Sequence, residues 1–276
     1  MKIGAIIQAR TTSTRLPAKV LKNLPYNSNI TILQQVIRRL KKSKKLDEII
    51  IATTNDREDG PIVDIANIEK VPFYRGERDD VLSRYYHAAK EHNLDTIVRI
   101  TSDCPVIDYN IVDEIIDAFL KENVDYATNT LKRTYPHGMD TEVFSFWVLK
   151  KAYKEAKKDF EREHVTPYIR LNPEKFRLLN IEATKESYGP DIRVTIDQEE
   201  DYALLCAVYD YLYNIDPYFT VQQIVGLFKE KPWLKIINKK IVQKKIFNSL
   251  EEEVKEAIKI LDLQDLKRAK KYLEKV

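Results

Sequence analysis

The sequence predicts an α/β protein with a mixed, mainly parallel sheet flanked by helices and followed by an appended C-terminal helix. The first observation is that short apolar runs alternate with amphipathic helical patterns through the first half, as in successive βαβ units. The second is that strand-like and helical patterns mix after Thr128. The third is a long helical pattern rich in Lys, Glu, Leu and Ile near the end.

Five apolar runs in the first half have the length and composition of buried strands. They cover residues 2–7, 48–52, 71–74, 96–100 and 124–127. Between them, apolar residues recur at helical spacing in residues 32–40 and 111–120, with charged residues on the opposite side. We therefore expect strands and helices to alternate along this half.

The second half has a more varied pattern. The stretches MDTEVFSF, FRLLNIEA and RVTID have the composition of strands. Helical patterns cover residues 147–157, 164–171 and 199–213. We expect these elements to complete one large domain over residues 1–238.

From residue 239 onwards, one long helical pattern runs to the end of the chain. Its apolar stripe contains Val254, Ile258, Leu261 and Leu266. We expect residues 239–276 to form a helical extension that covers the core or contacts a second copy.

The composition limits the class of protein. The 276 residues include 46 Lys and Arg against 43 Asp and Glu, a formal net charge of +3, so any affinity for phosphate must be local. Cys104 and Cys206 belong to no CxxC pair and support neither a disulfide framework nor a zinc site. No window has the length of a membrane span, and the apolar run before Gln8 is too short for a signal peptide. We therefore expect a soluble, unprocessed, cytoplasmic protein.

Residues that directly follow the strands are the candidates for ligand binding, because ligands of open α/β sheets bind outside the carboxyl ends of the strands. The stretch IIQARTTSTRLPAKVL holds more cationic and hydroxyl groups than a turn needs. Those after the first predicted strand are Arg10, Ser13, Arg15 and Lys19. Such side chains bind a polyphosphate. After the second strand, ATTND (residues 52–56) offers polar groups for a base edge or a ribose.

Two aspartates each end an apolar run. Asp103 lies in TSDCP (residues 101–105), after the fourth predicted strand, and Asp197 ends RVTID. Magnesium takes one or two carboxylates and keeps its other positions for phosphate and water, so this pair opposite a cationic loop predicts a magnesium site. Each aspartate taken alone is more often a helix cap or a turn residue, and acidic residues 199–201 also suit a helix dipole.

Two further stretches offer groups for a second, anionic and polyhydroxylated substrate. PHGMDTEVF contains His137, Asp140 and Glu142, and EREHVTPYIR contains His164 between Arg162 and Arg170. A turn at the glycine and a helix start at the histidine explain the same residues without a ligand. GERDDVLSRYYHAA also allows two interpretations, because its Asp80 could bind a ligand or could be the N-cap of a helix.

Seven stretches in this order resemble one family. They are IIQARTTSTRLPAKVL, IIIATTND, GERDDVLSRYYHAA, TSDCPVID, HGMDTEVFSF, REHVTPYI and RVTIDQEEDY. Together they resemble the cytidylyltransferase family that includes the spore-coat polysaccharide biosynthesis proteins, which is related to the CMP-sugar synthetases for KDO and sialic-acid-like sugars. The resemblance covers residues 1–228, and the ordered set is more specific than any single motif.

The resemblance implies a Rossmann-like, GT-A-like nucleotidyltransferase domain. Its implied activity is a magnesium-dependent transfer of CMP from CTP to an acidic sugar or related acceptor, with release of pyrophosphate, in surface polysaccharide or glycoconjugate biosynthesis. A homodimer is implied as well.

The resemblance also implies a role for individual residues. The nucleotide-binding residues are Gln8, Ala9, Arg10, Ser13, Arg15, Lys19, Ala52, Thr53, Asn55, Asp80, Arg84, Thr101 and Ser102. The catalytic residues are Arg10, Lys19 and Asp103, and the metal ligands are Asp103 and Asp197. The acceptor-binding residues are His137, Asp140, Glu142 and His164. Two positions depart from the family pattern, because Thr12 and Ala18 stand where members commonly have glycine, which predicts weaker backbone contact with phosphate.

Two other functions remain open at this level. A nucleotide-sugar glycosyltransferase shares this layout, but its usual mark is a DxD pair and TSDCP has one acid. A non-catalytic nucleotide-binding scaffold needs fewer charged groups than this chain gathers. Nothing in the residues names the acceptor, and the preference for cytosine rests on the resemblance.

Overall fold

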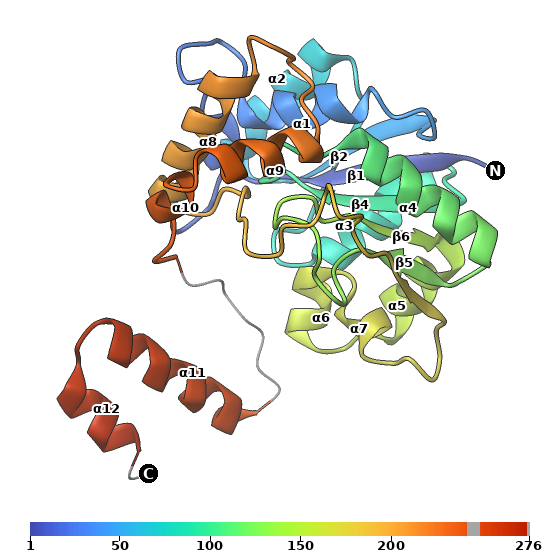
Figure 1. Cartoon of the computed structure of the whole chain (residues 1–276). Coiled ribbons are helices and arrows are strands. Elements are labelled where there is room, and N and C mark those ends of the chain that lie inside the picture. Colours follow the sequence, from blue (N-terminus) through green and yellow to red (C-terminus); the bar gives the residue numbers. More distant parts are fainter. Residues whose placement is uncertain (242–248, 275–276) are drawn as a thin grey trace. The chain divides into compact units, whose positions relative to one another are not determined.

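A computed structural model describes residues 1–241 and 249–274 of the chain. The chain divides into two compact units, Met1–Lys239 and Lys240–Val276, each of which is drawn in Figure 1. Among the described residues, no helix combines the length and the hydrophobicity that crossing a lipid bilayer requires.

The first unit is built on a mixed sheet whose strand order is β3-β2-β1-β4-β6-β5-β7. Its strands are β1 (Ile3–Gln8), β2 (Glu48–Thr54), β3 (Phe73–Gly76), β4 (Thr96–Thr101), β5 (Tyr126–Thr128), β6 (Glu142–Ser145) and β7 (Leu178–Asn180). Strands β1 to β4 run parallel, β6 is antiparallel to both β4 and β5, and β7 is parallel to β5. The predicted fold class, a mixed and mainly parallel sheet, is confirmed.

Helices cover both faces of this sheet (Figure 1). On one face lie α1 (Ile32–Leu40), α2 (Gly60–Glu69), α4 (Tyr109–Glu122), α8 (Glu199–Leu212) and α9 (Val221–Glu230). On the other lie α3 (Val81–Glu91), α5 (Phe146–Glu155), α6 (Asp159–His164) and α7 (Pro167–Arg170). Short helices η1 (Lys19–Leu21), η2 (Arg57–Asp59) and α10 (Leu234–Ile237) complete the unit.

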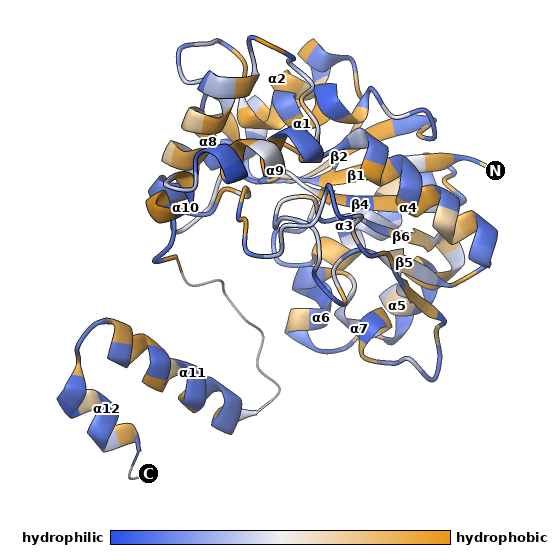
Figure 2. Ribbon diagram, in the orientation of Figure 1, coloured by the Kyte–Doolittle hydropathy of each residue, from blue (hydrophilic) through white to orange (hydrophobic). Residues whose placement is uncertain are grey.

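The apolar runs form strands because both of their faces are buried. In β1, the side chain of Ile6 packs in the core under α3, and those of Ala5 and Ile7 pack in the core under α1 and α4. The helices instead carry hydrophobic and hydrophilic residues side by side (Figure 2), since each buries one stripe. Helix α1 begins at a capping box, in which Gln34 N donates to Thr31 Oγ1 (3.2 Å) and Thr31 N to Gln34 Oε1 (2.9 Å).

Two details of the predicted first unit are wrong. RVTID forms no strand, because its backbone bonds to loops at His137 and Asp103 and makes only an isolated bridge between His137 and Arg193. The helix predicted over residues 164–171 is divided between α6 and α7, because Val165 has a φ of 72° and interrupts it.

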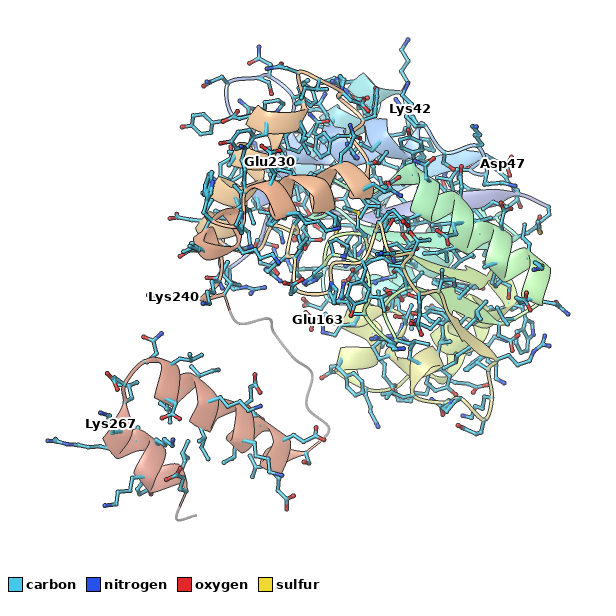
Figure 3. All side chains as sticks on the ribbon, in the orientation of Figure 1. Lys42, Asp47, Glu163, Glu230, Lys240 and Lys267 are labelled. Atoms are coloured by element: carbon cyan, nitrogen blue, oxygen red, sulfur yellow. The ribbon has the colours of Figure 1, made fainter. Side chains whose placement is uncertain are left out.

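The second unit contains α11 (Leu250–Leu263) and α12 (Lys267–Leu273) in its described part. The predicted single helix is therefore wrong in detail, because Asp265 has a φ of 57° and separates the two helices. Part of the predicted helix, residues 242–248, lies outside the described residues. Neither helix buries a side chain, and charged side chains such as Lys267 extend from them (Figure 3).

Candidate active site

The carboxyl ends of β1, β2 and β4 lie side by side. Gln8 at the end of β1 is in register with Ala52 of β2 and with Thr101 of β4. Ala9 N donates to Ala52 O (3.1 Å), and Ser102 N donates to Gln8 O (3.3 Å). The residues that follow these three strands therefore gather at one edge of the sheet, which is where the sequence predicts the site.

A buried carboxylate holds the first loop in place. Asp59 Oδ1 accepts hydrogen bonds from Thr11 N and Thr11 Oγ1, both at 2.7 Å. Its other oxygen, Oδ2, accepts hydrogen bonds from Thr54 Oγ1 and, at 3.4 Å, from Thr53 Oγ1 at the end of β2. Asp59 thus joins residues 9–19 to the second strand, a role that no sequence motif indicated.

Lys19 lies at the centre of the site. Its Nζ donates to Asp103 Oδ2 (2.9 Å), Asp197 Oδ1 (3.0 Å) and Ile196 O (2.6 Å). Lys19 begins η1, and the residue before it, Ala18, has a φ of 52°. Ala18 therefore adopts the left-handed conformation that glycine accepts at little cost, at one of the two positions where the sequence departs from the family pattern.

The extended segment that carries Asp197 is held by hydrogen bonds to two loops. Val194 N donates to His137 O (2.7 Å), and Ile196 N donates to Asp103 O (2.9 Å). Thr195 Oγ1 also donates to Asp103 O (3.0 Å). These bonds bring Asp197 next to Asp103. Asp103 follows β4 as predicted, but Asp197 follows an extended segment that is not a strand.

The charges of the central triad of Lys19, Asp103 and Asp197 support one another. Burial opposes ionisation of both carboxyl groups, but Lys19 outweighs it and holds the pKa of Asp103 and of Asp197 below the usual range. Burial likewise opposes the charge of Lys19, but the two carboxylates raise its pKa. All three groups are therefore ionised near neutral pH.

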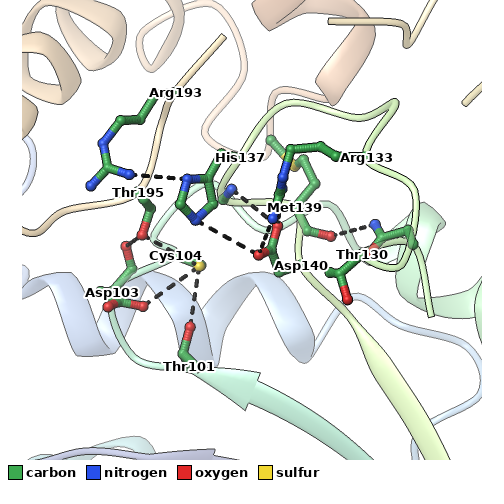
Figure 4. A network of polar contacts seen from close by, with 12 residues as sticks. Thr101, Asp103, Cys104, Thr130, Arg133, His137, Met139, Asp140, Arg193 and Thr195 are labelled. Atoms are coloured by element: carbon green, nitrogen blue, oxygen red, sulfur yellow. Dashed lines mark hydrogen bonds and ion pairs between the residues drawn. The ribbon is translucent and has the colours of Figure 1, made fainter. Parts of the chain in front are cut away.

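A polar network continues from Asp103 toward the loop before β6 (Figure 4). Arg133 binds Asp140 with two hydrogen bonds (2.6 and 2.8 Å). His137 lies between Asp140 (Nε2 to Oδ2, 3.7 Å) and Arg193 (Nδ1 to Nη1, 3.0 Å). His137 and Asp140, predicted to bind the acceptor, therefore lie together, beside the aspartate that is expected to hold the metal.

The network determines the state of His137. Because a guanidinium group only donates hydrogen bonds, His137 Nδ1 must accept from Arg193, and the ring proton is on Nε2. Burial lowers the pKa of His137, with Arg133 and Arg193 acting in the same direction and Asp140 against it. His137 is therefore neutral at pH 7 and presents an N–H group rather than a base.

Arg193 connects this network with the central triad. Its guanidinium donates to both oxygens of the buried Asp201 (2.9 and 3.0 Å) and to Asp197 Oδ2 (2.8 Å). Arg15 Nη2 lies 3.1 Å from the other oxygen of Asp197. Asp197 is thus oriented by three cationic side chains, of which Arg193 was not among the predicted site residues.

Two arginines of the site have no carboxylate partner in the described part of the chain. Arg10 is half-buried and makes no ion pair there. Arg84 is 2% exposed and donates only to carbonyl oxygens, from Nη1 to Ala52 (3.2 Å) and from Nη2 to Arg78 (3.4 Å). Burial lowers the pKa of Arg84, and the charge of Arg10 acts in the same direction, while Asp59 and Asp80 act against it without forming an ion pair. Uncompensated cations at this edge indicate a site for an anion.

Other predicted nucleotide-binding residues lie at the same edge with varied surroundings. Thr101 Oγ1 lies 3.3 Å from Cys104 Sγ, and Asn55 is exposed. Ser13 N donates to Thr11 O (2.8 Å). Asp80 instead caps α3, accepting from Ser83 N (2.9 Å), and binds Arg162 Nε (2.9 Å). The capping interpretation of Asp80 is therefore confirmed.

Two predicted acceptor-binding residues lie apart from the network of His137. The carboxylate of Glu142 faces α3 and α7 on the other side of the sheet, where it contacts Arg99 Nη1 and accepts from Tyr126 Oη (2.7 Å). His164 is the last residue of α6 and is half-buried. Arg133, Arg193 and Arg99 were not predicted as site residues. Arg99 and Arg193 contact Glu142 and His137, which are distant in the sequence, and Arg133 contacts Asp140 across a loop that has no sequence signal of its own.

The two central carboxylates suit a magnesium ion. Each places an ionised oxygen within 3.0 Å of the same lysine nitrogen, and hard oxygen ligands are those that magnesium prefers. Among the described residues, no group of three or more His, Cys, Asp or Glu side chains is placed to hold a metal ion. A magnesium ion at this position would therefore depend on phosphate and water for its other ligands.

The comparison with known families decides the identity. The sequence profile described as "Cytidylyltransferase" matches residues 4–236. The chain belongs to the cytidylyltransferase family. The predicted family is confirmed, and membership makes the chain a nucleotidyltransferase.

Individual relatives agree with this membership. An uncharacterized protein of Methanocaldococcus jannaschii is 42% identical over 246 residues, 88% of this chain and 97% of that protein. The spore coat polysaccharide biosynthesis protein SpsF of Bacillus subtilis is 34% identical over 206 residues, 74% of this chain and 85% of that protein. The structure of a cytidylyltransferase from Leptospira borgpetersenii superposes with a TM-score of 0.80 at 35% identity, covering 88% of this chain and 100% of that one.

Proposed function

We propose that this cytidylyltransferase transfers CMP from CTP to an acidic sugar or related acceptor, in a magnesium-dependent reaction that releases pyrophosphate. The observation that carries the proposal is the pairing of two ionised aspartates, Asp103 and Asp197, with uncompensated arginines at one edge of the sheet. A nucleoside triphosphate with a divalent cation needs both signs of charge in one site.

The first loop supplies groups that suit the triphosphate. Arg10 and Arg15 offer guanidinium donors to phosphoryl oxygens. In the described part of the chain, the backbone N–H groups of Thr12, Thr14 and Leu16 donate to no other protein group. The hydroxyl of Thr12 is buried without a hydrogen-bond partner. Unused donors of this kind form an anion-binding concavity, so backbone contacts remain available although two glycines of the family pattern are missing.

Lys19, Asp103 and Asp197 would organise the reacting groups. A bound magnesium ion would supply charge neutralisation at the phosphoryl oxygens. Lys19 holds the two carboxylates next to each other before a metal ion binds. The acceptor hydroxyl oxygen attacks the α-phosphorus and releases its proton to solvent, the bond from the α-phosphorus to the oxygen that bridges it to the β-phosphorus breaks, and pyrophosphate leaves. Positioning and charge stabilisation account for such a reaction without a covalent intermediate.

The acceptor assignment is supported by relatives and by polar groups beside Asp103. Proteins described as 3-deoxy-manno-octulosonate cytidylyltransferases, such as that of Fusobacterium nucleatum, are 33% identical over 132 residues, 48% of this chain and 51% of that protein. The Nε2–H group of His137 and the carboxylate of Asp140 lie near Asp103 and suit sugar hydroxyls. A role in surface polysaccharide biosynthesis is supported by the likeness to SpsF.

The proposal is tested by measuring pyrophosphate release with each of the four nucleoside triphosphates against a panel of sugar acids, with magnesium and with EDTA. We expect that, of the four nucleotides, only CTP gives pyrophosphate release, and only when magnesium and a suitable sugar acid are present. The mass spectrum should then show a CMP conjugate of that acid. Asp103→Asn and Asp197→Asn should each lower kcat by about 10²-fold or more, the effect of removing one preorganised charge-stabilising group.

Asp117→Asn is the matched control, because Asp117 forms an exposed ion pair with Lys45 away from the site. It should leave pyrophosphate release unchanged. Equal release with EDTA and with magnesium, or full activity of folded Asp103→Asn, would refute the metal assignment.

A further inference from the structure

A group of buried polar atoms around Glu142 lacks hydrogen-bond partners in the described part of the chain. These atoms are Arg99 Nε, Thr166 Oγ1 and Arg170 Nε. Arg99 comes from β4 and Glu142 from the start of β6, while Thr166 is the N-cap residue before α7 and Arg170 is the last residue of α7. We call Arg99, Tyr126, Glu142, Thr166 and Arg170 the Glu142 cluster.

Members of the cluster contact one another around the carboxylate. Arg99 Nη1 and Tyr126 Oη each donate to one oxygen of Glu142. Thr166 is 1% exposed, and its hydroxyl faces Glu142 closely enough to help lower the pKa of that carboxyl, although it makes no well-formed hydrogen bond; the charge of Arg170 acts on both Glu142 and Tyr126. The cluster therefore brings two guanidinium groups and a hydroxyl to one carboxylate.

The cluster carries an excess positive charge. Burial opposes the ionisation of Glu142, but Arg99 and Arg170 outweigh it and hold the pKa of this carboxyl below its usual range. Burial raises the pKa of Tyr126, so the phenol is neutral. Two guanidinium charges thus face one carboxylate. Buried donors without acceptors disfavour folding, so the cluster is better explained by a ligand than by stability.

Its composition selects the ligand. A carboxylate only accepts hydrogen bonds and has two oxygens, which match two Nε–H donors and one hydroxyl. A single negative charge also balances the single excess positive charge, whereas a phosphate dianion would exceed it and would be repelled by Glu142.

The cluster is also close enough to the central triad to act on the same substrate. Arg99 and Asp103 are four residues apart, so their Cα atoms are separated by at most about 14 Å. We propose that Arg99, Thr166 and Arg170 bind the carboxylate of the acceptor, on the opposite side of the site from His137 and Asp140. This proposal rests on the proposed function, because it names the subsite that would make the acceptor an acid.

The test uses thermal unfolding of the full chain with D-glucuronate as the probe and D-glucose as its neutral counterpart, at equal ionic strength. The measurements are made with and without saturating CTP, because bound CTP occupies the cations of the first loop. A shift that persists with CTP therefore does not come from glucuronate bound to that loop. At ten times its dissociation constant, glucuronate should raise the wild-type Tm by about 2–4 °C, and glucose should not.

Thr166→Val and Arg170→Gln should each abolish this shift. Arg177→Gln should keep it, because Arg177 is 64% exposed and outside the cluster. Without ligand, Thr166→Val should melt close to the wild type, since among the described residues the hydroxyl makes no well-formed hydrogen bond.

The proposal would be overturned if glucuronate did not raise the Tm of the wild type, or if the variants responded like the wild type. The polar groups of the cluster would then be structural groups that bind water. CTP binding, measured separately by calorimetry, shows whether the proposed function itself fails. CTP that binds while glucuronate and glucose act alike refutes the carboxylate subsite alone.

Discussion

Replacing Lys19 with methionine tests whether this lysine holds the two metal-binding carboxylates together. Asp103 and Asp197 each contact its Nζ, at 2.9 and 3.0 Å, so their oxygens are at most about 6 Å apart. The side chains of Lys19, Asp103 and Asp197 are 12%, 25% and 20% exposed, so solvent screens them only in part. Methionine keeps the length of the side chain and removes its charge.

The magnitude follows from Coulomb's law. Two like charges about 5 Å apart at an effective dielectric constant of about 20 repel by about 3 kcal/mol. Lys19→Met should therefore lower the free energy of unfolding by about 3 kcal/mol at pH 7. In the wild type both aspartates have lowered pKa values, so they stabilise the fold above about pH 4 and lose that effect as the pH falls. In the variant their pKa values rise, and the deficit should shrink as the pH falls toward about 4.

Urea denaturation at pH 7 and pH 4, with and without magnesium chloride, provides the assay. Magnesium should restore much of the lost stability of Lys19→Met at pH 7, because a divalent cation replaces the ammonium group between the carboxylates. Lys45→Met, which breaks the exposed pair with Asp117, should change little and should not respond to magnesium. If Lys19→Met is as stable as this control and indifferent to magnesium, the carboxylates are not held by Lys19.

Three further substitutions test the groups around the triad. Arg193→Gln should lower the free energy of unfolding by about 3 kcal/mol, as measured by urea denaturation. Arg193→Lys should recover little of that stability, because the two bonds to the buried Asp201 need the two donors of a guanidinium group. A lysine variant as stable as the wild type would contradict this. Asp59→Asn should lower stability by about 2 kcal/mol and weaken CTP binding in calorimetry, because asparagine keeps only one of the two acceptor oxygens that Asp59 offers to Thr11 and Thr54; unchanged affinity would show that the loop needs no anchor. Ala18→Gly should raise stability by up to about 1 kcal/mol, because glycine adopts a φ of 52° at little cost, and a loss of stability would contradict that account.

The sequence predicted the parts of the fold that local composition determines. The strands of the first half lie within three residues of their predicted bounds, because continuous apolar runs such as IIIA in β2 are buried on both faces. The proximity of Lys19 and Asp103 also followed, since parallel strands end at a common edge, whereas Asp197 joins them through hydrogen bonds between its segment and two loops.

Long-range pairing could not be predicted in the same way. RVTID has the composition of a strand, but its partners are loop residues, and no local signal distinguishes the two cases. Glu142 illustrates the same limit, because Arg99 and Tyr126 occupy its carboxylate on the face of the sheet away from His137. Asp59 resembles an ordinary surface acid of a charged turn, and only the fold shows that it is buried.

The reversed direction of β6 has a consequence for how this edge of the sheet can change. Because β6 is antiparallel to β4, the segment that enters it meets the edge where β1, β2 and β4 end. Residues 129–141 therefore reach the edge from a connection that begins after β5 and contributes nothing to the first loop. Insertions or deletions in residues 129–136, before the HGMDTEVFSF stretch, would reshape one half of the edge while the strand order and the cationic loop stay the same, so grafting experiments can begin there.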